Sequence, residues 1–405
     1  MNPYLGHTED ERQEILRAIG LNSIDELFES VPAEIQFPGD LGIPQGLDES
    51  QLLWKAGELS SANLPGVGPK AFLGAGIYEH MIPSVVNHLV SRGEFLTAYT
   101  PYQPEASQGV LQAFFEFQTM VCNLTNMPIA NASLYDGSTA LAEACLAALG
   151  TAKNKSRIVL SAGVHPQYRQ TLESYLANLP YEIEVAPMRD GRVDLDALNL
   201  ENVAGVAVQH PNYFGLLEDM PAISEAVHAA GSDFIAVVEP VSLAVLAPPG
   251  DYKADIAIGE GQPLGLHTYM GGDTVGLFAC TEKYMRRIPG RLVGEAVDRN
   301  GKTGYVLTLQ TREQHIRREK ATSNICTNQG LNALKAAIFI SALGPQGLRE
   351  MAGAWCKNTH YLVERLRETC GARPAFEGAY FGECVVRLGV DARALPAKLL
   401  EQGSV

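Results

Sequence analysis

Apolar residues in the middle of the chain occur in short runs that alternate with helical patterns. Runs such as 158–160 and 203–208 contain no charged residue, and helical apolar spacing follows them at 167–179 and 223–230. Such runs are typical of strands buried on both faces of a parallel sheet. The alternation therefore predicts an α/β domain with a mostly parallel sheet. Further strands are predicted at 183–185, 234–238, 255–258 and 275–280.

Helical signals dominate the two ends of the chain. Near the N-terminus, Thr8 with Glu11 and Ser23 with Glu26 have the spacing of capping boxes. An apolar stripe over 109–124 predicts a helix that faces a core. Further helices are predicted at 82–90, 331–343, 348–367 and 395–400, with a strand at 381–388. We expect three parts: an N-terminal helical segment 1–65, a large α/β domain 66–330 and a small α+β C-terminal domain 331–405.

A proline-rich loop separates the helices predicted at 82–90 and 109–124. In residues 97–109, Pro101 and Pro104 exclude a regular helix or a central strand. The same loop carries Tyr99, Tyr102 and Glu105, which are hydrogen-bonding groups suited to a small polar ligand. An ordinary connector with tyrosines at its surface explains the composition equally well.

Polar residues also lie where strands end or helices begin. Ser133, Asp136 or Ser138 can cap the alanine-rich helix that follows them, and the first N–H groups of that helix form a natural anion site. Tight packing of a capped helix without a ligand is the alternative. His165 and Glu239 follow predicted strands, where ligands of parallel sheets bind, although each is equally explained as a turn residue.

Composition narrows the class of protein. The 405 residues carry a formal net charge of −15, which argues against nucleic acid or an anionic membrane as a partner. The N-terminus lacks the pattern of a secretory signal, and the apolar runs fall short of the about 20 residues that a membrane span needs. Seven scattered cysteines include no CxxC pair, so neither a zinc site nor a disulfide framework is supported. We expect a cytoplasmic protein.

Several long motifs resemble one family. Residues 98–105 (AYTPYQPE), 130–133 (ANAS), 259–265 (GEGQPLG) and 307–320 (LTLQTREQHIRREK) are similar to the P-proteins of the glycine cleavage system, the glycine dehydrogenases (decarboxylating). The last two motifs most resemble subunit 1, the alpha subunit of the split bacterial form. The resemblance covers the chain from Gly6 onward.

This resemblance implies a fold and a reaction. The fold is that of the fold-type I pyridoxal-phosphate (PLP)-dependent transferases. The family decarboxylates glycine with PLP and passes the aminomethyl group to the lipoyl group of the H-protein. Subunit 1 is expected to work as an α₂β₂ complex with subunit 2, the beta subunit.

The lysine that such chemistry needs is missing from its expected place. Aligned on Asp255, the family's catalytic histidine–lysine pair falls on Gln262 and Pro263, and no lysine occurs between Lys253 and Lys283. Because proline cannot form a Schiff base, the resemblance implies that the beta subunit holds PLP. Glu239 likewise replaces the aspartate expected to face the pyridine ring. The expected remnant is a pseudo-site near four residues: Ser138, Glu239, Gln262 and Pro263.

The proline-rich loop then becomes a candidate contributor to the partner's site. Tyr99 and Tyr102 are expected to orient substrate or cofactor through their hydroxyl groups. Glu105 is expected to hold a polar group or shuttle a proton, with His80 as a secondary companion.

Two other functions are consistent with the residues. One is a self-sufficient PLP lyase or aminotransferase that uses Lys253, although this lysine precedes its strand and so lies at the wrong end. The other is a non-catalytic regulatory or scaffold pseudoenzyme subunit. Because members of the family continue with another strand and a closing helix, we also expect the small domain to be truncated at Val405.

Overall fold

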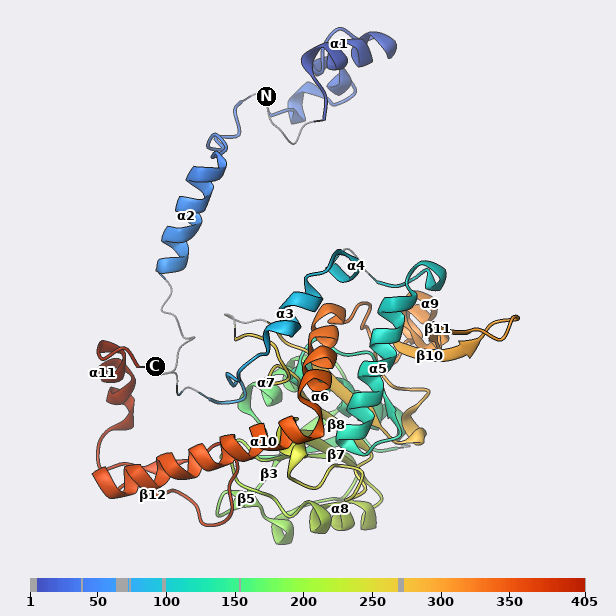
Figure 1. Cartoon of the computed structure of the whole chain (residues 1–405). Coiled ribbons are helices and arrows are strands. Elements are labelled where there is room, and N and C mark those ends of the chain that lie inside the picture. Colours follow the sequence, from blue (N-terminus) through green and yellow to red (C-terminus); the bar gives the residue numbers. More distant parts are fainter. Residues whose placement is uncertain are drawn as a thin grey trace. The chain divides into compact units, whose positions relative to one another are not determined.

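The computed structural model describes residues 6–37, 39–62, 72, 74–96, 100–152, 154–268 and 273–404. The chain divides into two compact units, Met1–Pro65 and Gly66–Val405 (Figure 1). Within the described ranges we find no helix with the length and hydropathy required to cross a bilayer. The three-part domain division stays a prediction, and its boundary at residue 331 falls at the start of α10 (Gly330–Cys370).

The first unit consists of short helices with little core. Its elements are α1 (Glu9–Ala18), η1 (Asp25–Phe28), η2 (Ala33–Ile35) and α2 (Glu49–Ser61). The predicted capping box at Thr8 and Glu11 is formed, and both reciprocal bonds are present. At Ser23 the side chain accepts only one long bond from the Glu26 N–H, and a 3-10 turn results instead of an α-helix. Among the described residues of this unit, only Leu16 is buried.

The second unit is built on a seven-stranded sheet. Its strand order is β1 (Ile129–Ala130), β9 (Gly276–Cys280), β8 (Ile256–Glu260), β7 (Asp233–Val238), β6 (Val203–His210), β2 (Arg157–Ser161) and β3 (Glu182–Ala186). The last five run parallel, whereas β9 is antiparallel to both of its neighbours. The predicted α/β class with a mostly parallel sheet is therefore confirmed.

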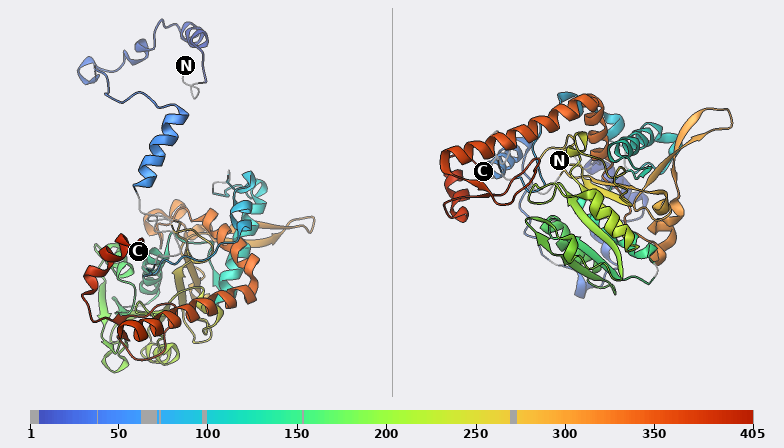
Figure 2. Two further views of the ribbon diagram at one scale, coloured as in Figure 1. Left: turned by 60° about the vertical axis from the view of Figure 1, so that its left-hand side comes forward. Right: turned by 90° about the horizontal axis from the view of Figure 1, so that it is seen from below.

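Helices cover both faces of this sheet (Figure 2). One face packs against α6 (Gly137–Thr151) and α7 (Pro166–Leu176). The other face packs against α8 (Met220–Ala229) at one side and against α3 (Ser84–Val90), α5 (Gln108–Thr125) and α10 at the other. Because α6 follows β1 directly, its first turn lies beside the carboxyl end of β8, where Gly137 meets Glu260.

A two-stranded hairpin that the sequence analysis did not predict projects from the body. It consists of β10 (Leu292–Val297) and β11 (Thr303–Thr308) (Figures 1 and 2). Side-chain amides from α5 bind both strands at the root of the hairpin. Gln118 bonds the backbone N–H and C=O of Val293, and Gln108 bonds those of Tyr305.

The two predicted helices at 331–343 and 348–367 follow each other within α10. They are separated by Gly344, with φ 64° and ψ −179°, and by Pro345. The helix α11 (Leu395–Glu401) confirms the prediction at 395–400. Beyond these, α4 (Gly93–Leu96), α9 (Gln314–Arg317), the strand pair β4 (Met188–Arg189) and β5 (Arg192–Val193), and short 3-10 turns complete the unit.

The predicted strand at 381–388 is largely wrong. Only Val386–Arg387 forms a strand, β13, paired with β12 (Arg373–Pro374). The backbone N–H of Phe381 donates to the Gly215 carbonyl, and Gly382 lies against the Trp355 ring. These contacts with a loop and with α10 replace pairing with a neighbouring strand.

Candidate functional site

The carboxyl ends of the parallel strands enclose a small cavity, which we call the carboxyl-end cleft. Its volume is about 40 Å³. The lining residues are Gly76, Tyr78, His165, Tyr168, Gln209, Val237, Val238, Glu239, Glu260 and Pro263. A water molecule needs roughly 10–15 Å³ of such volume. The cleft has room for a few water molecules.

The N-terminus of α6 is already occupied by carboxylates. Asp136 Oδ1 accepts the N–H groups of Ser138 at 2.7 Å and Thr139 at 2.9 Å. Gly137 donates its N–H to Glu260 Oε2 at 2.9 Å. Of the two interpretations open from the sequence, this geometry favours a capped helix packed without a ligand. Two carboxylates at this place also oppose an incoming phosphate by charge and by competition for the same donors.

Both oxygens of the Glu260 carboxyl group accept hydrogen bonds from the backbone. Of these, Oε1 accepts from the N–H groups of Gln262 at 2.8 Å and Val275 at 3.0 Å. Burial raises the pKa of Glu260 to about 7, although the three N–H groups act in the opposite direction. The carboxyl group therefore joins the ends of β8 and β9 to the start of α6.

Gln262 serves a structural purpose at the position aligned with the family's catalytic pair. Its side chain is fully buried, accepts from the Tyr78 N–H at 3.0 Å and donates to the carbonyls of Tyr78 at 3.0 Å and Leu266 at 2.8 Å. Pro263, which follows, lines the cleft. The amide thus fastens the segment around Tyr78 over the cleft, and neither residue offers an amine.

Glu239 caps its own turn instead of facing a ring nitrogen. Its two oxygens accept from the N–H groups of Val241 at 3.0 Å and Ser242 at 2.6 Å. Burial raises the pKa of Glu239 to about 8. Ser138, the remaining member of the predicted pseudo-site, donates to Asp136 Oδ1 and accepts from Thr171 on α7.

His165 behaves as a turn residue, as the alternative interpretation expects. Its Nδ1 accepts from the Gln167 N–H, its Nε2 lies 2.8 Å from the Ala75 carbonyl, and its ring packs on Tyr213. His80 lies against Trp355 of α10, and burial lowers its pKa to about 4.

The residues of the carboxyl-end cleft do not fit PLP. Among the described residues that line the cleft there is no amine for a Schiff base, and the helix N-terminus beside it is bonded to Asp136 and Glu260. Tyr168 fills the site further, because its hydroxyl lies where a Cβ on Gly137 would stand.

The described residues of the proline-rich loop are not part of the lining of this cleft and lie beside the β10–β11 hairpin. Tyr99 falls outside the described residues. Tyr102 is 53% exposed, and Glu105, in the short turn η3 (Pro104–Ala106), is also exposed. The Tyr102 ring rests on the guanidinium of Arg291, with Cζ 4.9 Å from the ring centre. Arg291 was missed by the sequence analysis, because one arginine after Pro-Gly gives no signal of its burial.

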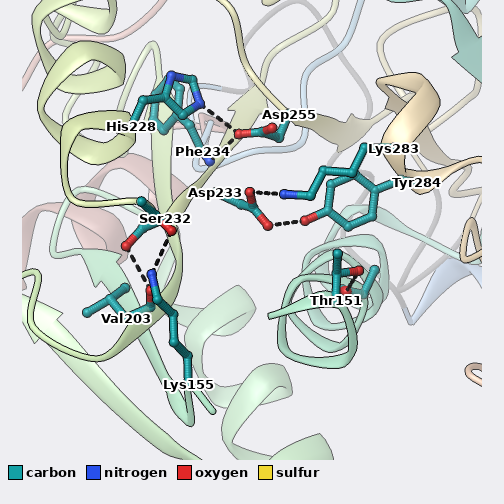
Figure 3. Close-up of polar contacts among 12 residues, drawn as sticks. Thr151, Lys155, Val203, His228, Ser232, Asp233, Phe234, Asp255, Lys283 and Tyr284 are labelled. Carbon is teal, nitrogen blue, oxygen red and sulfur yellow. Dashed lines mark hydrogen bonds and ion pairs between the residues drawn. The ribbon is translucent and has the colours of Figure 1, made fainter. Parts of the chain in front are cut away.

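A second polar cluster lies at the opposite end of the sheet (Figure 3). Asp233 at the start of β7 accepts from Lys283 and from the Tyr284 hydroxyl, and His228 Nε2 lies 2.8 Å from Asp255 Oδ2. We call these five residues the amino-end cluster. They tie the amino ends of β7 and β8 to the segment after β9.

The same end of the sheet carries Lys253, the lysine of the self-sufficient alternative. Lys253 precedes β8 and is exposed. The strand itself, at about 3.3 Å per residue, separates it from the cleft by more than roughly 13 Å. Lys253 therefore does not reach the carboxyl-end cleft.

Comparison with known proteins gives a consistent family. The family model described as "Glycine cleavage system P-protein" matches residues 2–404. The chain is 47% identical over 408 residues to the probable glycine dehydrogenase (decarboxylating) subunit 1 of Geobacillus kaustophilus, covering 100% of this chain and 91% of the relative. It is 49% identical over 389 residues to the protein of the same name from Bacillus cereus, covering 95% and 87%.

Comparison with solved structures gives the same family. The chain superposes with a TM-score of 0.92 and 48% identity on a crystal structure of glycine decarboxylase (P-protein) of the glycine cleavage system in inhibitor-bound form, covering 99% of this chain and 91% of the other. Sphingosine-1-phosphate lyase from Burkholderia pseudomallei gives a TM-score of 0.66 at 12% identity, covering 92% and 86%. The second match shows a shared fold alone.

Proposed function

Since the chain belongs to the glycine cleavage system P-protein family, we propose that it is the non-lysine subunit of a two-subunit glycine dehydrogenase (decarboxylating), with PLP held by its partner. The curated relatives named above are subunit 1 proteins, which implies a partner subunit within the glycine cleavage system. These names do not favour a purely regulatory or scaffold role. We further propose an α₂β₂ assembly that acts on glycine and on the lipoylated H-protein.

The chemistry of the carboxyl-end cleft carries the assignment of PLP to the partner. Gln262 and Pro263 offer no amine. The side-chain amide of Gln262 makes its three hydrogen bonds to backbone atoms of Tyr78 and Leu266. Glu260 takes the N–H of Gly137, which a phosphate would need. These contacts support a cofactor site outside the cleft.

The exposed groups near Arg291 are this chain's proposed contribution to that site. PLP supplies an electron sink for decarboxylation when it is bound. Tyr102 is half-exposed and carries a hydroxyl that can orient the substrate, and the exposed Glu105 carries a carboxylate that can hold a proton or a polar group. Tyr99 belongs to the same proposal.

Reconstitution tests the assignment of PLP. The chain is purified alone and together with subunit 2, and cofactor retained after gel filtration is measured by its visible absorbance. We expect the chain alone to retain none and the mixture to retain it and to catalyse glycine–CO₂ exchange with H-protein. Cofactor bound by the isolated chain, and lost in Lys253→Ala, would contradict the proposal.

Substitutions test the contribution of the loop. In the mixture, we expect Tyr102→Phe and Glu105→Gln to lower the exchange rate at least about tenfold, as loss of a contact to a charged group does. Tyr361→Phe and Glu116→Gln, at exposed positions of α10 and α5, are the matched controls. Full activity of both loop variants, with PLP bound only in the mixture, would leave the scaffold role.

A further inference from the structure

Arg291 is the largest fully buried side chain of the described protein, with 1% of its surface exposed. A buried guanidinium is costly unless it is paired and hydrogen-bonded. Its Nη2 donates to the Cys326 carbonyl at 2.6 Å and to the Tyr102 hydroxyl oxygen at 3.1 Å. Its Nη1 lies 3.7 Å from Glu313 Oε2. Three separate segments therefore meet at this one side chain.

The contact with Tyr102 involves the ring as well as the hydroxyl. The guanidinium carbon lies 4.9 Å from the ring centre, within the range of a cation–π interaction. Tyr102 is 53% exposed, so part of its side chain is accessible to another molecule. The backbone beneath is also fixed, because the Tyr102 N–H donates to the Thr100 carbonyl and Gln108 donates to the Pro104 carbonyl.

The direction of the hydrogen bond sets what the tyrosine can do. Arginine has only donors, so the Tyr102 oxygen accepts from Arg291. The phenolic hydrogen is then left to donate to another molecule. A donor over a buried positive charge suits an acceptor that carries negative charge, such as an amino acid carboxylate.

We propose that Arg291 is a positioning residue that fixes the Tyr102 ring so that its hydroxyl donates to the substrate carboxylate in the partner's site. The proposal rests on the function proposed above. Arg291 is buried and acts only through Tyr102. Its loss is therefore expected to raise the KM for glycine more than it lowers kcat.

Arg312 provides a matched control. It is also a buried arginine, it follows β11 as Arg291 precedes β10, and it is the chain neighbour of Glu313, the carboxylate beside Arg291. It donates to the Ile288 carbonyl. In the part of the chain that the structure describes, Arg312 makes no hydrogen bond, ion pair or ring contact with Tyr102. Substitution of either arginine should lower the stability of the protein, but only substitution of Arg291 should raise the KM for glycine.

The experiment is a double-mutant cycle in the complex with subunit 2. We compare Arg291→Lys and Arg291→Gln in the wild-type and Tyr102→Ala backgrounds, with Arg312→Lys as control, and measure KM and kcat for glycine–CO₂ exchange. We expect Arg291→Gln to raise KM about tenfold, as loss of one oriented hydrogen bond does, and Arg291→Lys to raise it less. In the Tyr102→Ala background, neither change should raise KM by more than about twofold.

The outcomes separate the two proposals. An equal rise in KM in both backgrounds, or the same rise in Arg312→Lys, would overturn the role of Arg291 while leaving that of Tyr102. An unchanged KM in Tyr102→Ala itself would overturn both roles. If Arg291→Gln does not fold, Arg291→Lys keeps the buried charge and completes the cycle, with thermal unfolding of each complex recorded beside its kinetics.

Discussion

Glu260 shows how one side chain can close a site. Its carboxyl group accepts three backbone N–H groups and at the same time keeps a pKa near neutrality because it is buried. A group whose folded pKa is raised binds more protons in the folded state than in the unfolded state. Its contribution to stability is complete below the unfolded pKa and is lost as the pH rises through the folded pKa.

The stability of the protein should therefore depend on pH through Glu260. Between the ordinary pKa of 4.5 and the folded pKa of about 7, the wild type should lose roughly 3 kcal/mol that Glu260→Gln does not lose. Denaturant unfolding of both proteins at pH 4.5, 6 and 7.5 measures this difference. Glu116→Gln, on the solvent side of α5, controls for removing a carboxylate.

Burial lowers the pKa of His80 and of His210 to about 4 each. Their contribution has the opposite sign, because it is present above pH 6.5 and lost on acidification. It is common to wild type and variant, so it cancels in the comparison. A wild type and a Glu260→Gln variant with parallel pH profiles would contradict the prediction.

Asp233 anchors the amino-end cluster. It bonds the Tyr284 hydroxyl and Lys283, whose side chain is 45% exposed. Asp233→Ala should cost about 3 kcal/mol, because it removes the acceptor of the Tyr284 hydroxyl and breaks the ion pair. Lys283→Met should cost less than about 1 kcal/mol, as expected of a solvent-screened pair. Urea unfolding distinguishes them, and equal losses would assign the stabilisation to the ion pair instead of the hydroxyl.

At the scale of single residues, the sequence shows which chemical groups are present but not which of them contact one another. The absence of a lysine near Pro263 is visible in the sequence and supports the proposal that the partner holds PLP. The contacts of Gln262 with Tyr78 and of Arg291 with Tyr102 could not be predicted, because each joins positions far apart in the chain. The separations are 184 and 189 residues. Local patterns carry no record of such long-range pairs.

The helix α10 is interrupted at Gly344 by the backbone conformation of that residue. Gly344 has φ 64° and ψ −179°, a conformation that is essentially restricted to glycine, and no atom lies near a Cβ built there. Gly344→Ala should therefore lower the free energy of unfolding by about 2 kcal/mol through backbone strain alone.

Gly353 is the matched control in the same helix. It is exposed, has helical dihedrals and also has no atom near a built Cβ. Gly353→Ala should raise stability by roughly 0.5–1 kcal/mol, because alanine is the better helix former. Thermal unfolding of the two variants should thus give shifts of opposite sign, and shifts of the same sign would refute the strain argument.

Element prediction succeeded where the pattern was long and failed where tertiary contacts decided. The break itself could be predicted, because Gly344-Pro345 is a strong interruption between two periodic stretches. The hairpin was missed although Asn300-Gly301 is a recognised turn signal. The alternating residues 381–385 fail to form a strand because their backbone and Gly382 contact a loop and Trp355.

At the scale of the molecule, the two units differ in how much of themselves they bury. The sheet of the second unit has cores on both faces, and its α/β class with mostly parallel strands was predicted from the alternating pattern. In the first unit, Leu16 is the only buried residue among those described, while large apolar residues such as Trp54 and Phe37 are exposed. Its helices form from local capping, which the sequence does display.

This difference predicts the pattern of amide exchange. In the isolated chain, amides of α1 and α2 should exchange at least about a hundredfold faster than those of β6, because local opening needs little free energy where few apolar contacts are buried. Hydrogen–deuterium exchange with peptide-level mass spectrometry measures both regions in one sample. Equal protection of α2 and β6 would mean that the first unit has a core comparable to the sheet.

The two glutamines at the root of the hairpin have a further consequence. A strand that protrudes with free edges is a template on which another chain can add a strand, and so a start for aggregation. Here the outward N–H and C=O groups of Val293 on one edge and of Tyr305 on the other are already taken by side-chain amides. The glutamines therefore occupy, at Val293 and at Tyr305, the places that a neighbouring strand would take. The arm can therefore extend from the body without offering its root to edge-to-edge polymerisation.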